Sequence, residues 1–552
     1  MTEWTPYDIP LNMHPQKPLI TYLARCFNIE PILMHHLFVH NIKNEESLSN
    51  FLYPCLDEMH NPFLLNEMKE AIVRIIQAIK NNEKILIFGD YDCDGITATS
   101  ILYKALRMLK ANVDYRLPIR SEGYGLSPMA IEQLADDISL IITVDNGSSA
   151  HPAMEIAKRR GIDVIVTDHH DILGKHPDCH AFINPKRLDN TYPFTGLAGA
   201  GVALKVVQAL FIAGKISWQK YGPLFLELAT LGTIADLMPL EGENRIICWL
   251  GLRIMNNNPQ PTLRKLFKLL KINHVDSSTI GFQIGPILNS CGRIDDPNKA
   301  VRILMNPSTT DQELHYLINL NKRRKEMTKH QFSQIEKKII ENEWYKQKVI
   351  VVCDEFDNGI IGIIAARITN RFKKPAIVIS QHGTGSARSL NGTDFSIINV
   401  INKCSQYLNK FGGHQAAAGL SMDLRDFDHF RLAIQQAALE EEPLQPKINF
   451  IGNIPFHLFS NHLFDDLSAL EPFGMAFPKP LFYCSPIAIR HHQTFGKNNE
   501  HLKFTIHKKE AIAFNKGAFK KQLQEQALPE FLYTPNCIKK KDFLIHDLRI
   551  AP

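Results

Sequence analysis

Carboxylate and imidazole side chains follow apolar runs in one part of this chain, where together they could bind metal. They are Asp90, Asp92, Asp94, Asp145, Asp168, His169 and His170. Such runs are typical of parallel strands, whose carboxyl ends meet at one edge of a sheet, where ligands bind. Carboxylates gathered there repel one another unless a counter-charge is present, and divalent cations usually supply it. The pattern predicts a metal site, to which Asp236, after a helical segment from Leu224, would add an oxygen ligand.

The ligand types indicate which ion binds and what it does. Oxygen and imidazole ligands without thiolates favour Mg²⁺ or Mn²⁺, and histidine somewhat prefers Mn²⁺. Two such ions about 3.5–4 Å apart could share a carboxylate, activate a water and neutralise the leaving oxygen of a phosphoryl displacement. A single aspartate at a strand end is more often a helix cap or a turn residue, so the argument depends on the whole set. We therefore expect a metal-dependent phosphodiesterase that acts on nucleic acid.

The elements that must position these side chains lie between Lys84 and about Asp236. Short apolar runs alternate there with amphipathic stretches, which predicts an α/β domain with a doubly wound, mainly parallel sheet. The expected strands are 85–88, 113–117, 140–144 and 164–167, and helical periodicity marks 98–109 and 129–134. The glycine-rich loop 196–201 is a weak candidate for dinucleotide binding, because no clear strand precedes it and no acidic residue follows about 20 positions on.

The rest of the 552 residues divides further. The absence of Gly and Pro after Pro307, to about Trp344, predicts one long helix, and its run Lys322-Arg323-Arg324-Lys325 either lines a path for phosphates or is a solvated face. A smaller α/β domain and an aromatic-rich β-barrel follow. The expected units are a helical scaffold (1–70), the α/β catalytic domain (71–306), the connecting helix (307–345), the smaller α/β domain (346–442) and the barrel (443–552).

Composition and charge narrow the function classes. The net charge of +5 arises from 62 basic and 57 acidic residues, so any nucleic-acid surface must be local. The ten cysteines show no metal-binding or paired spacing, which predicts reduced thiols in a cytoplasmic protein. The N-terminus lacks a signal-peptide pattern and nowhere do about 18 apolar residues run together, so we expect no membrane association. Adjacent histidines are usually surface residues, as we expect for His35 and His36.

Taken in order, the motifs of this chain resemble the DHH phosphoesterase superfamily over roughly residues 70–515. The motifs are Asp90-Tyr-Asp-Cys-Asp-Gly95, Asp145-Asn-Gly147, Asp168-His-His170, Leu197-Ala-Gly-Ala-Gly201, Ala235-Asp236, Asn289-Ser-Cys-Gly-Arg293, Gly385-Ser-Ala-Arg-Ser389, Phe411-Gly-Gly-His414 and Leu470-Glu-Pro-Phe-Gly474. Phe88 stands where other branches of the superfamily have a histidine, which favours the branch of bacterial single-strand-specific 5′→3′ DNA exonucleases. The turn 474–478 departs from the pattern of that branch.

The resemblance implies a role for each matched residue. The implied metal ligands are Asp92, Asp94, Asp145, His169 and Asp236, with Asp90 beside them and His170 next to the scissile phosphate. The implied catalytic residues among these are Asp92, Asp94, His169, His170 and Asp236. The implied substrate-binding residues are Asn289, Arg293, Ser386, Arg388, Gly413, His414 and Lys503. Of the latter, those from Ser386 to His414 belong to a DHH-associated domain, and Lys503 belongs to a barrel of the oligonucleotide-binding (OB) type.

The implied activity is 5′→3′ exonuclease digestion of single-stranded DNA, with two ions of Mn²⁺ or Mg²⁺ and release of 5′-mononucleotides. Roles in DNA repair, recombination and mismatch repair, substrate delivery by a helicase and a single-strand-binding protein, and a monomeric state follow from the resemblance alone. Two alternatives stay open. One is a short-oligonucleotide or cyclic-dinucleotide phosphodiesterase, whose relatives lack the long barrel-bearing tail. The other is a non-catalytic scaffold, against which the retained ligand positions argue.

Overall fold

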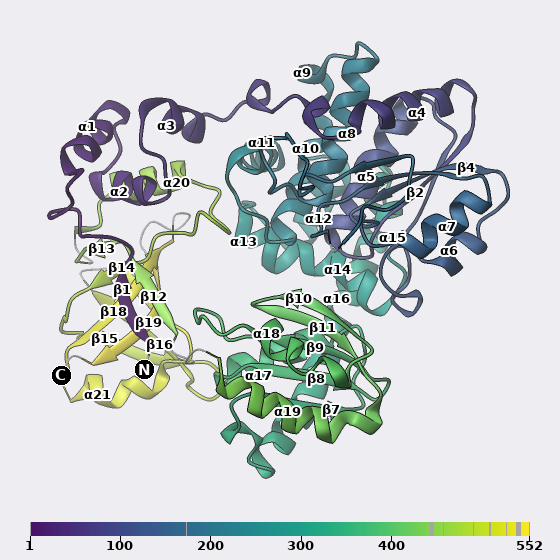
Figure 1. Cartoon of the computed structure of the whole chain (residues 1–552). Coiled ribbons are helices and arrows are strands. Elements are labelled where there is room, and N and C mark those ends of the chain that lie inside the picture. Colours follow the sequence, from purple (N-terminus) through teal and green to yellow (C-terminus); the bar gives the residue numbers. More distant parts are fainter. Residues whose placement is uncertain are drawn as a thin grey trace. The chain divides into compact units, whose positions relative to one another are not determined.

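The computed structural model of the chain describes residues 2–172, 174–441, 446–455, 458–489, 491–506, 509–525, 527–536 and 542–550. These residues form two compact units (Figure 1). The larger unit comprises 56–238 and 242–446, and the smaller unit comprises 2–55, 239–241 and 447–552. Within the described part, no helix is both long enough and apolar enough to cross a membrane.

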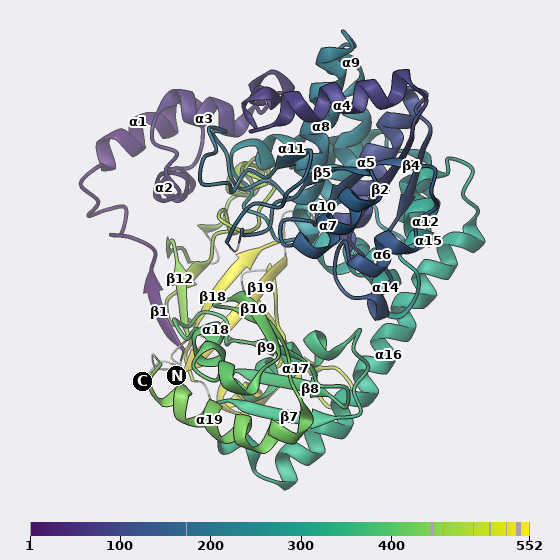
Figure 2. The same cartoon turned by 45° about the vertical axis from the view of Figure 1, so that its right-hand side comes forward.

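A five-stranded parallel sheet organises the first part of the larger unit and confirms the fold that the sequence predicts. The strand order is β3 (Val113–Arg116), β2 (Lys84–Phe88), β4 (Ile138–Val144), β5 (Asp163–Thr167) and β6 (Ala181–Ile183). The helices around it are α4 (Met68–Lys80), α5 (Cys93–Met108), α6 (Pro128–Glu132), α7 (His151–Arg159), α8 (Gly199–Ala213) and α10 (Pro223–Ala235) (Figure 2). Leu86 and Phe88 share a buried core with α6 and α7, whereas α5 and α8 pack against each other and against β2 and β4. Burial on both faces explains why the strands are almost continuously apolar.

A helical layer leads from this sheet to the next domain. It comprises α9 (Trp218–Tyr221), α11 (Gly242–Asn257), α12 (Pro261–Leu270), α13 (Ser277–Thr279), the π-helical turn Ile280–Ile284, α14 (Gly285–Ile294) and α15 (Asn298–Met305). The expected long helix is α16 (Asp311–Glu341). It begins at a capping box, in which Oγ1 of Thr310 accepts from the N–H of Glu313 at 3.2 Å and Oε2 of Glu313 accepts from the N–H of Thr310 at 2.9 Å.

The second sheet of the larger unit is mixed. Its order is β10 (Lys410–His414), β11 (Ala417–Ser421), β9 (Thr384–Arg388), β8 (Ala376–Ser380) and β7 (Ile350–Asp354), and only β7 and β8 are parallel. Its helices are α17 (Ile361–Phe372), α18 (Ile397–Asn402) and α19 (Phe427–Leu439). Val352 shares a buried core with α16 and α17, and its neighbour Val351 shares another with α18 and α19. The alternation of side chains therefore buries both faces of this sheet.

The smaller unit is built around a seven-stranded sheet. The strand order is β13 (Gly452–Asn453), β14 (Phe482–Cys484), β18 (Pro529–Pro535), β19 (Asp542–Ile550), β17 (Lys509–Ala513), β16 (His501–Ile506) and β15 (His491–Phe495). Its helices are α1 (Lys17–Phe27), α2 (Pro31–Val39), α3 (Glu45–Leu52), α20 (Asn461–Ala469) and α21 (Lys520–Gln524). The N-terminal strand β1 (Glu3–Pro6) pairs in parallel with β12 (Lys447–Phe450), so the two ends of the chain fold together.

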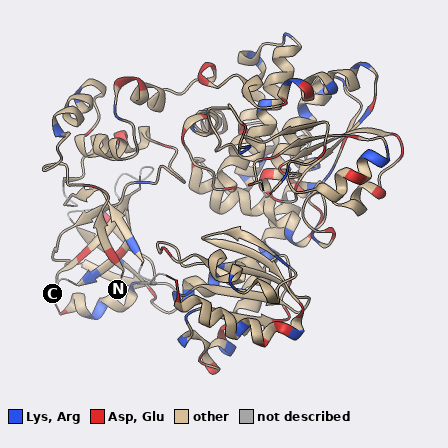
Figure 3. Cartoon of the chain, viewed as in Figure 1, with Lys and Arg blue, Asp and Glu red and all other residues tan. Residues whose placement is uncertain are grey.

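The N-terminal helices share one apolar core with this sheet, through Met34, Leu37, Phe464 and Phe482 among others. Residues 2–55 thus pack with the C-terminal segment, while 56–70 fold with the larger unit. The domain boundary expected at 442/443 falls outside the described residues, and the other expected boundaries stay predictions. Basic and acidic residues are interspersed along the ribbon (Figure 3), in agreement with the small net charge of +5.

The expectation that His35 and His36 lie at the surface is wrong. Both side chains are 0% exposed on α2. Nε2 of His36 donates to the carbonyl oxygen of Pro478 at 3.0 Å, and its ring packs against Phe477. The pair is buried because α2 is covered by other parts of the smaller unit. The ring of His35 packs against that of His14, and its Nε2 lies 4.0 Å from Oδ2 of Asp8.

Candidate metal centre

The loop after β2 is fixed by hydrogen bonds to its own backbone. Asp92 is the N-cap of α5, and its Oδ1 accepts from the N–H of Gly95 at 3.0 Å. Oδ1 of Asn289, on α14, accepts from the N–H of Cys93 at 2.7 Å. A Cβ on Gly95 would lie 2.4 Å from the carbonyl oxygen of Asp90, so the turn requires glycine there. These contacts hold the three aspartates of the loop at the carboxyl edge of the sheet.

Asp94 is held by the N-terminus of α8. Its Oδ2 accepts from the N–H of Gly199 at 2.6 Å and its Oδ1 accepts from the N–H of Ala200 at 2.9 Å. The unpaired N–H groups and the dipole of a helix N-terminus stabilise such an anion. A Cβ on Gly199 would lie 2.5 Å from Cβ of Asp145, and a Cβ on Gly232 would lie 2.4 Å from Oδ1 of Asp94. The glycine-rich loop 196–201 therefore leads into a helix that binds a carboxylate of the chain itself.

Three carboxylates converge on one ring nitrogen of His169. Nε2 of His169 lies 3.0 Å from Oδ1 of Asp145, 3.6 Å from Oδ2 of Asp236 and 3.7 Å from Oδ2 of Asp94. Asp145 follows β4 in a left-handed conformation with φ of 62°, His169 follows β5, and Asp236 is the C-cap of α10. Side chains from three elements thus meet at the edge that the sequence predicts.

A second group of ligand atoms lies beside the first. Asp90, Asp92 and Asp145 each offer a carboxylate oxygen, and these oxygens lie within 4.8 Å of one another. Several of the atoms concerned are buried without a hydrogen-bond partner in the described part of the chain, namely Oδ1 of Asp90, Oδ1 of Asp145 and Nδ1 of His169. Buried polar atoms normally have partners, so these residues fit divalent cations bound by oxygen and imidazole. Asp145 is placed to serve two ions.

The carboxyl groups of the centre disfavour negative charge where they lie, as expected of a site that suits cations. Burial, followed by repulsion from neighbouring carboxylates, raises the pKa of Asp94 to about 7 and that of Asp236 to about 8. The same causes raise the pKa of Asp90 and of Asp145 well above the ordinary value. Burial, with repulsion from the next imidazole, lowers the pKa of His169 to about 3, which keeps its ring neutral and able to bind metal.

His170 differs from His169 in its surroundings. Its Nδ1 lies 2.7 Å from Oδ1 of Asp168, whose Oδ2 accepts from the N–H of Ser148 at 2.9 Å. Burial disfavours the charged ring, but the hydrogen bond and charge of Asp168 outweigh burial and raise the pKa of His170 to about 9. The half-exposed ring is therefore held as a hydrogen-bond donor beside the candidate metal ligands.

Tyr124, which was not predicted from the sequence, also contacts Asp145 and His170. Its hydroxyl donates to the carbonyl oxygen of Asp145 at 3.2 Å and lies 3.2 Å from the ring nitrogens of His170. Gly123 and Gly125 flank it with φ of 96° and 67°. The sequence contained one indication that this loop has a special conformation, namely two glycines around one aromatic residue after a strand. Positive φ values favour glycine.

Two arginines lie near the loop that contains Asp90. Nη1 of Arg293 donates to the carbonyl oxygen of Gly359 at 3.0 Å, and burial, with the charges of neighbouring arginines, lowers its pKa to about 10. Arg120, which sequence analysis also missed, places its guanidinium 4.4 Å from the ring centre of Tyr91 and donates through Nε to the carbonyl oxygen of Gly292 at 3.2 Å. Neither arginine forms an ion pair with a carboxylate among the described residues.

The predicted substrate-binding residues of the second sheet lie on β9 and β10. Nη1 of Arg388 donates to the carbonyl oxygen of Ala387 at 2.8 Å and to Oγ of Ser386 at 3.3 Å, and burial lowers the pKa of Arg388. His414 is largely exposed, with its Nδ1 3.6 Å from Oδ2 of Asp171, next to the Asp-His-His motif. These groups leave guanidinium and imidazole N–H donors for a phosphate.

Two further predicted residues are Gly413, next to His414 on β10, and Lys503, on β16 of the smaller unit. Gly413 has φ of 150°, and a Cβ there would lie 2.4 Å from the carbonyl oxygen of Ala417, so β10 and β11 approach closely. Lys503 belongs to the smaller unit, where its Nζ lies 2.9 Å from a carboxylate oxygen of Glu510 on the adjacent strand. The binding roles of these residues stay predictions.

Three segments of the chain match described protein families. Residues 84–233 match the DHH family, N-terminal domain, residues 346–440 match the DHHA1 domain, and residues 452–541 match the RecJ OB domain. The crystal structure of RecJ in complex with Mn²⁺ from Thermus thermophilus is 25% identical to the chain, with a TM-score of 0.85. The match covers 100% of this chain and 80% of that chain.

Curated relatives extend the likeness over most of the sequence. The single-stranded-DNA-specific exonuclease RecJ of Bacillus subtilis is 35% identical over 536 residues, which cover 93% of this chain and 66% of that protein. The chain therefore spans slightly less than two thirds of the Bacillus protein. The RecJ of Haemophilus influenzae is 34% identical over 521 residues, which cover 88% of this chain and 89% of that protein. Given this identity over nearly the whole Haemophilus protein, the chain belongs to the RecJ family.

Proposed function

We propose that the chain is a metal-dependent exonuclease that digests single-stranded DNA from its 5′ end and releases 5′-mononucleotides. The observation that carries this proposal is the convergence of Asp94, Asp145 and Asp236 on Nε2 of His169, at 3.0 to 3.7 Å. Such a set of oxygens with one imidazole suits Mn²⁺ or Mg²⁺. The relatives named single-stranded-DNA-specific exonucleases, and the Thermus structure that contains Mn²⁺, support the same activity and cofactor.

The arrangement of the ligands supports two ions. One group of possible ligands is Asp94, His169 and Asp236, and another is Asp90, Asp92 and Asp145. A third group, Asp145, His169 and His170, overlaps the other two, so Asp145 could be shared between ions. Two bound divalent cations neutralise the charge that develops on a phosphate during in-line displacement. The contribution of the chain is to hold these six side chains in place before substrate arrives, through the cap of α5, the N-terminus of α8 and the ends of β4 and β5.

Other side chains orient the phosphate. His170, fixed by Asp168, is placed to donate a hydrogen bond to a phosphate oxygen at the metal centre. Arg388 and Ser386 form one donor pair and His414 offers another, and charge-assisted hydrogen bonds from such groups are the strong ones. In this proposal they hold the end of the strand while the bond next to the metal ligands is cleaved.

The finer parts of the proposal depend on family membership. Selectivity for single strands is supported by the matched RecJ OB domain, which contains Lys503 on β16. We propose that the chain acts as a cytoplasmic monomer, receives single strands from a helicase and a single-strand-binding protein, and serves DNA repair, recombination and mismatch repair. A short-oligonucleotide phosphodiesterase remains the alternative that the experiment below must exclude.

The experiment is a time course on single-stranded DNA labelled at its 5′ or its 3′ end, beside a duplex, with and without Mn²⁺. We expect release of the 5′ label first, as a mononucleotide, only with the cation and only from the single strand. Asp92→Ala should be inactive under all conditions. Earlier loss of the 3′ label would contradict the polarity, digestion in EDTA would contradict the metal requirement, and digestion of short oligonucleotides alone would favour the alternative.

A further inference from the structure

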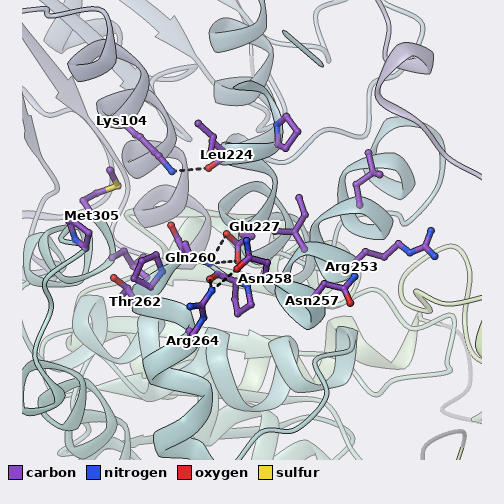
Figure 4. Close-up of a pocket in the computed structure, with 17 residues that line it drawn as sticks. Lys104, Leu224, Glu227, Arg253, Asn257, Asn258, Gln260, Thr262, Arg264 and Met305 are labelled. Atoms are coloured by element: carbon purple, nitrogen blue, oxygen red, sulfur yellow. Dashed lines mark hydrogen bonds between the residues drawn. The ribbon is translucent and has the colours of Figure 1, made fainter. Parts of the chain in front are cut away.

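A cavity of about 870 Å³ opens among helices of the larger unit (Figure 4). Residues of α5, α10, α11, α12 and α15 line it, and none of the residues discussed above as metal or substrate ligands does. Its walls are largely apolar, with Leu250, Ile254, Leu304 and Met305 among them. Cavities of this size and character hold small molecules, with a few polar groups fixing the orientation of the ligand.

The cavity lies at the far ends of the two helices that lead to metal ligands. Lys104 lines it ten residues beyond Asp94 along α5, and Glu227 lines it nine residues before Asp236, the C-cap of α10. At the helical rise of 1.5 Å per residue, about 15 Å of helix separates the cavity from the metal centre. A molecule bound in the cavity is therefore distinct from substrate at the metal centre.

Glu227 is a buried carboxyl group in the cavity wall with too few partners. Glu227 is 4% exposed. Its two carboxylate oxygens accept from a single backbone N–H, that of Gln260, at 3.1 and 3.2 Å. No described Lys, Arg or His nitrogen lies within 4.0 Å of them. Burial raises the pKa of Glu227 to about 7, although the Gln260 hydrogen bond and two nearby cations oppose this. Buried charges are normally paired, so Glu227 retains acceptor capacity for a ligand.

A buried amide donor lies beside this carboxyl group. Nε2 of Gln260 has no hydrogen-bond partner within the described ranges, although the atom is inaccessible to solvent. In Figure 4 the side chains of Lys104, Gln260 and Arg264 lie around that of Glu227. The cavity thus presents a carboxylate that accepts and an amide that donates within one small region.

Three cations line the same cavity without a carboxylate partner in the described part of the chain. Nζ of Lys104 donates to the carbonyl oxygen of Leu224 at 2.9 Å. Nη2 of Arg264 donates to Oδ1 of Asn258 at 2.6 Å, and the guanidinium of Arg253 lies 4.0 Å from the ring centre of Trp249. Each retains N–H donors, and together they outweigh the one acidic group, so the cavity favours an anion.

We propose that this cavity binds a guanine nucleotide. Guanine offers N–H donors at N1 and N2 to the carboxylate of Glu227, and its O6 accepts from Nε2 of Gln260 once that amide turns into the cavity. The apolar walls cover the faces of the base, and Lys104, Arg253 and Arg264 supply donors to phosphate. Adenine presents an acceptor at N1 where guanine has a donor, so it fits less well. Released deoxyguanosine monophosphate and free guanosine di- or triphosphate share this chemistry.

The test is calorimetric titration of the full-length chain with dGMP, GDP and GTP in EDTA, which prevents binding through metal. Glu227→Gln should weaken binding by at least about tenfold, because the new amide presents a donor to N1–H and a bidentate contact to a base edge is lost. Lys104→Met should also weaken it. Glu70→Gln, at an exposed position of α4, is the matched control and should bind as the wild type does.

The location is checked separately from the affinity. Photo-cross-linking with an 8-azidoguanosine phosphate should label peptides within 223–264, and Arg388→Ala should leave both labelling and affinity unchanged. Tighter binding of dGMP would identify the released product as the ligand, and tighter binding of GDP or GTP would identify free nucleotide as the ligand. Either result supports a guanine-nucleotide site in this cavity. Equal affinity for AMP, unchanged binding by both variants, or labelling confined to 346–440 would overturn the proposal.

Discussion

Nε2 of His169 lies 3.0 Å from Oδ1 of Asp145, yet that oxygen has no hydrogen-bond partner among the described residues. The opposite nitrogen, Nδ1, is also buried and without a partner. Burial keeps the ring neutral, so one lone pair on nitrogen and several on oxygen face the same small space. Groups arranged in this way suit a common cation, which supports the proposed metal site.

The first prediction concerns this pair. His169→Ala should lower the affinity for Mn²⁺ by more than about 100-fold, since even partners of metal ligands typically contribute 10–100-fold. Nuclease activity at low Mn²⁺ should fall in parallel. Calorimetric titration with Mn²⁺ measures the affinity, and His330→Ala, at an exposed position of α16, is the control. Wild-type affinity in the His169 variant would show that the ring does not bind metal.

The second prediction separates substrate binding from metal binding. Arg388→Ala removes the positive charge of the donor pair that Arg388 and Ser386 form on β9. A hydrogen bond to a charged group contributes about 1.5–3 kcal/mol, so KM for single-stranded DNA should rise roughly 10- to 150-fold. The affinity for Mn²⁺ should not change. Arg425→Ala is the matched control, because Arg425 lies in the same domain and pairs with Asp423 at the surface. A lower kcat with unchanged KM would contradict a binding role.

The parallel sheet and the grouping of ligands were predictable because they depend on local pattern. The strands β2, β4 and β5 are apolar on both faces, and each is followed by carboxylate or imidazole side chains. Parallel strands bring these side chains together at one edge of the sheet, so their grouping follows from topology alone. β6 was missed because Ala181–Ile183 is too short to show periodicity. Its hydrogen bonds come from β5, a partner that no property of the three residues reveals.

Contacts distant in sequence were the main part that could not be predicted. β1 pairs with β12, so that Trp4 stands opposite Ile448, and no local pattern reports such a pairing. The burial of His36 has the same origin, since its partner Pro478 comes from the other end of the chain. Asp168 was identified with its motif, but its role in orienting His170 became apparent only from the 2.7 Å contact between them.

The third prediction concerns the close approach of α8 to the metal centre. Gly199→Ala places a Cβ 2.5 Å from Cβ of Asp145, so α8 or Asp145 must move. We expect a loss of about 1–3 kcal/mol in the free energy of unfolding from overpacking, together with weaker Mn²⁺ binding. Gly201→Ala is the matched control on the same helix, because its Cβ would meet only side-chain atoms, at 3.2 Å or more. Equal effects of the two substitutions would contradict a specific role for Gly199.

The fourth prediction is a loss of stability in mild acid that originates at His36. Burial, followed by the charge of His40, lowers the pKa of His36 to about 3, whereas the unfolded chain titrates near the ordinary value of 6.5. The unfolded state therefore binds more protons between these values, so the stabilising contribution is complete above about pH 6.5 and is lost as the pH falls toward 3. The loss should approach about 1.4 kcal/mol per pH unit for one proton.

His36→Asn keeps an N–H donor for the Pro478 carbonyl but cannot titrate, so its denaturation midpoint in urea should change less between pH 7 and pH 5 than that of the wild type. His330→Asn, at an exposed site, should keep the wild-type slope, and an unchanged slope in His36→Asn would assign the acid sensitivity to other groups.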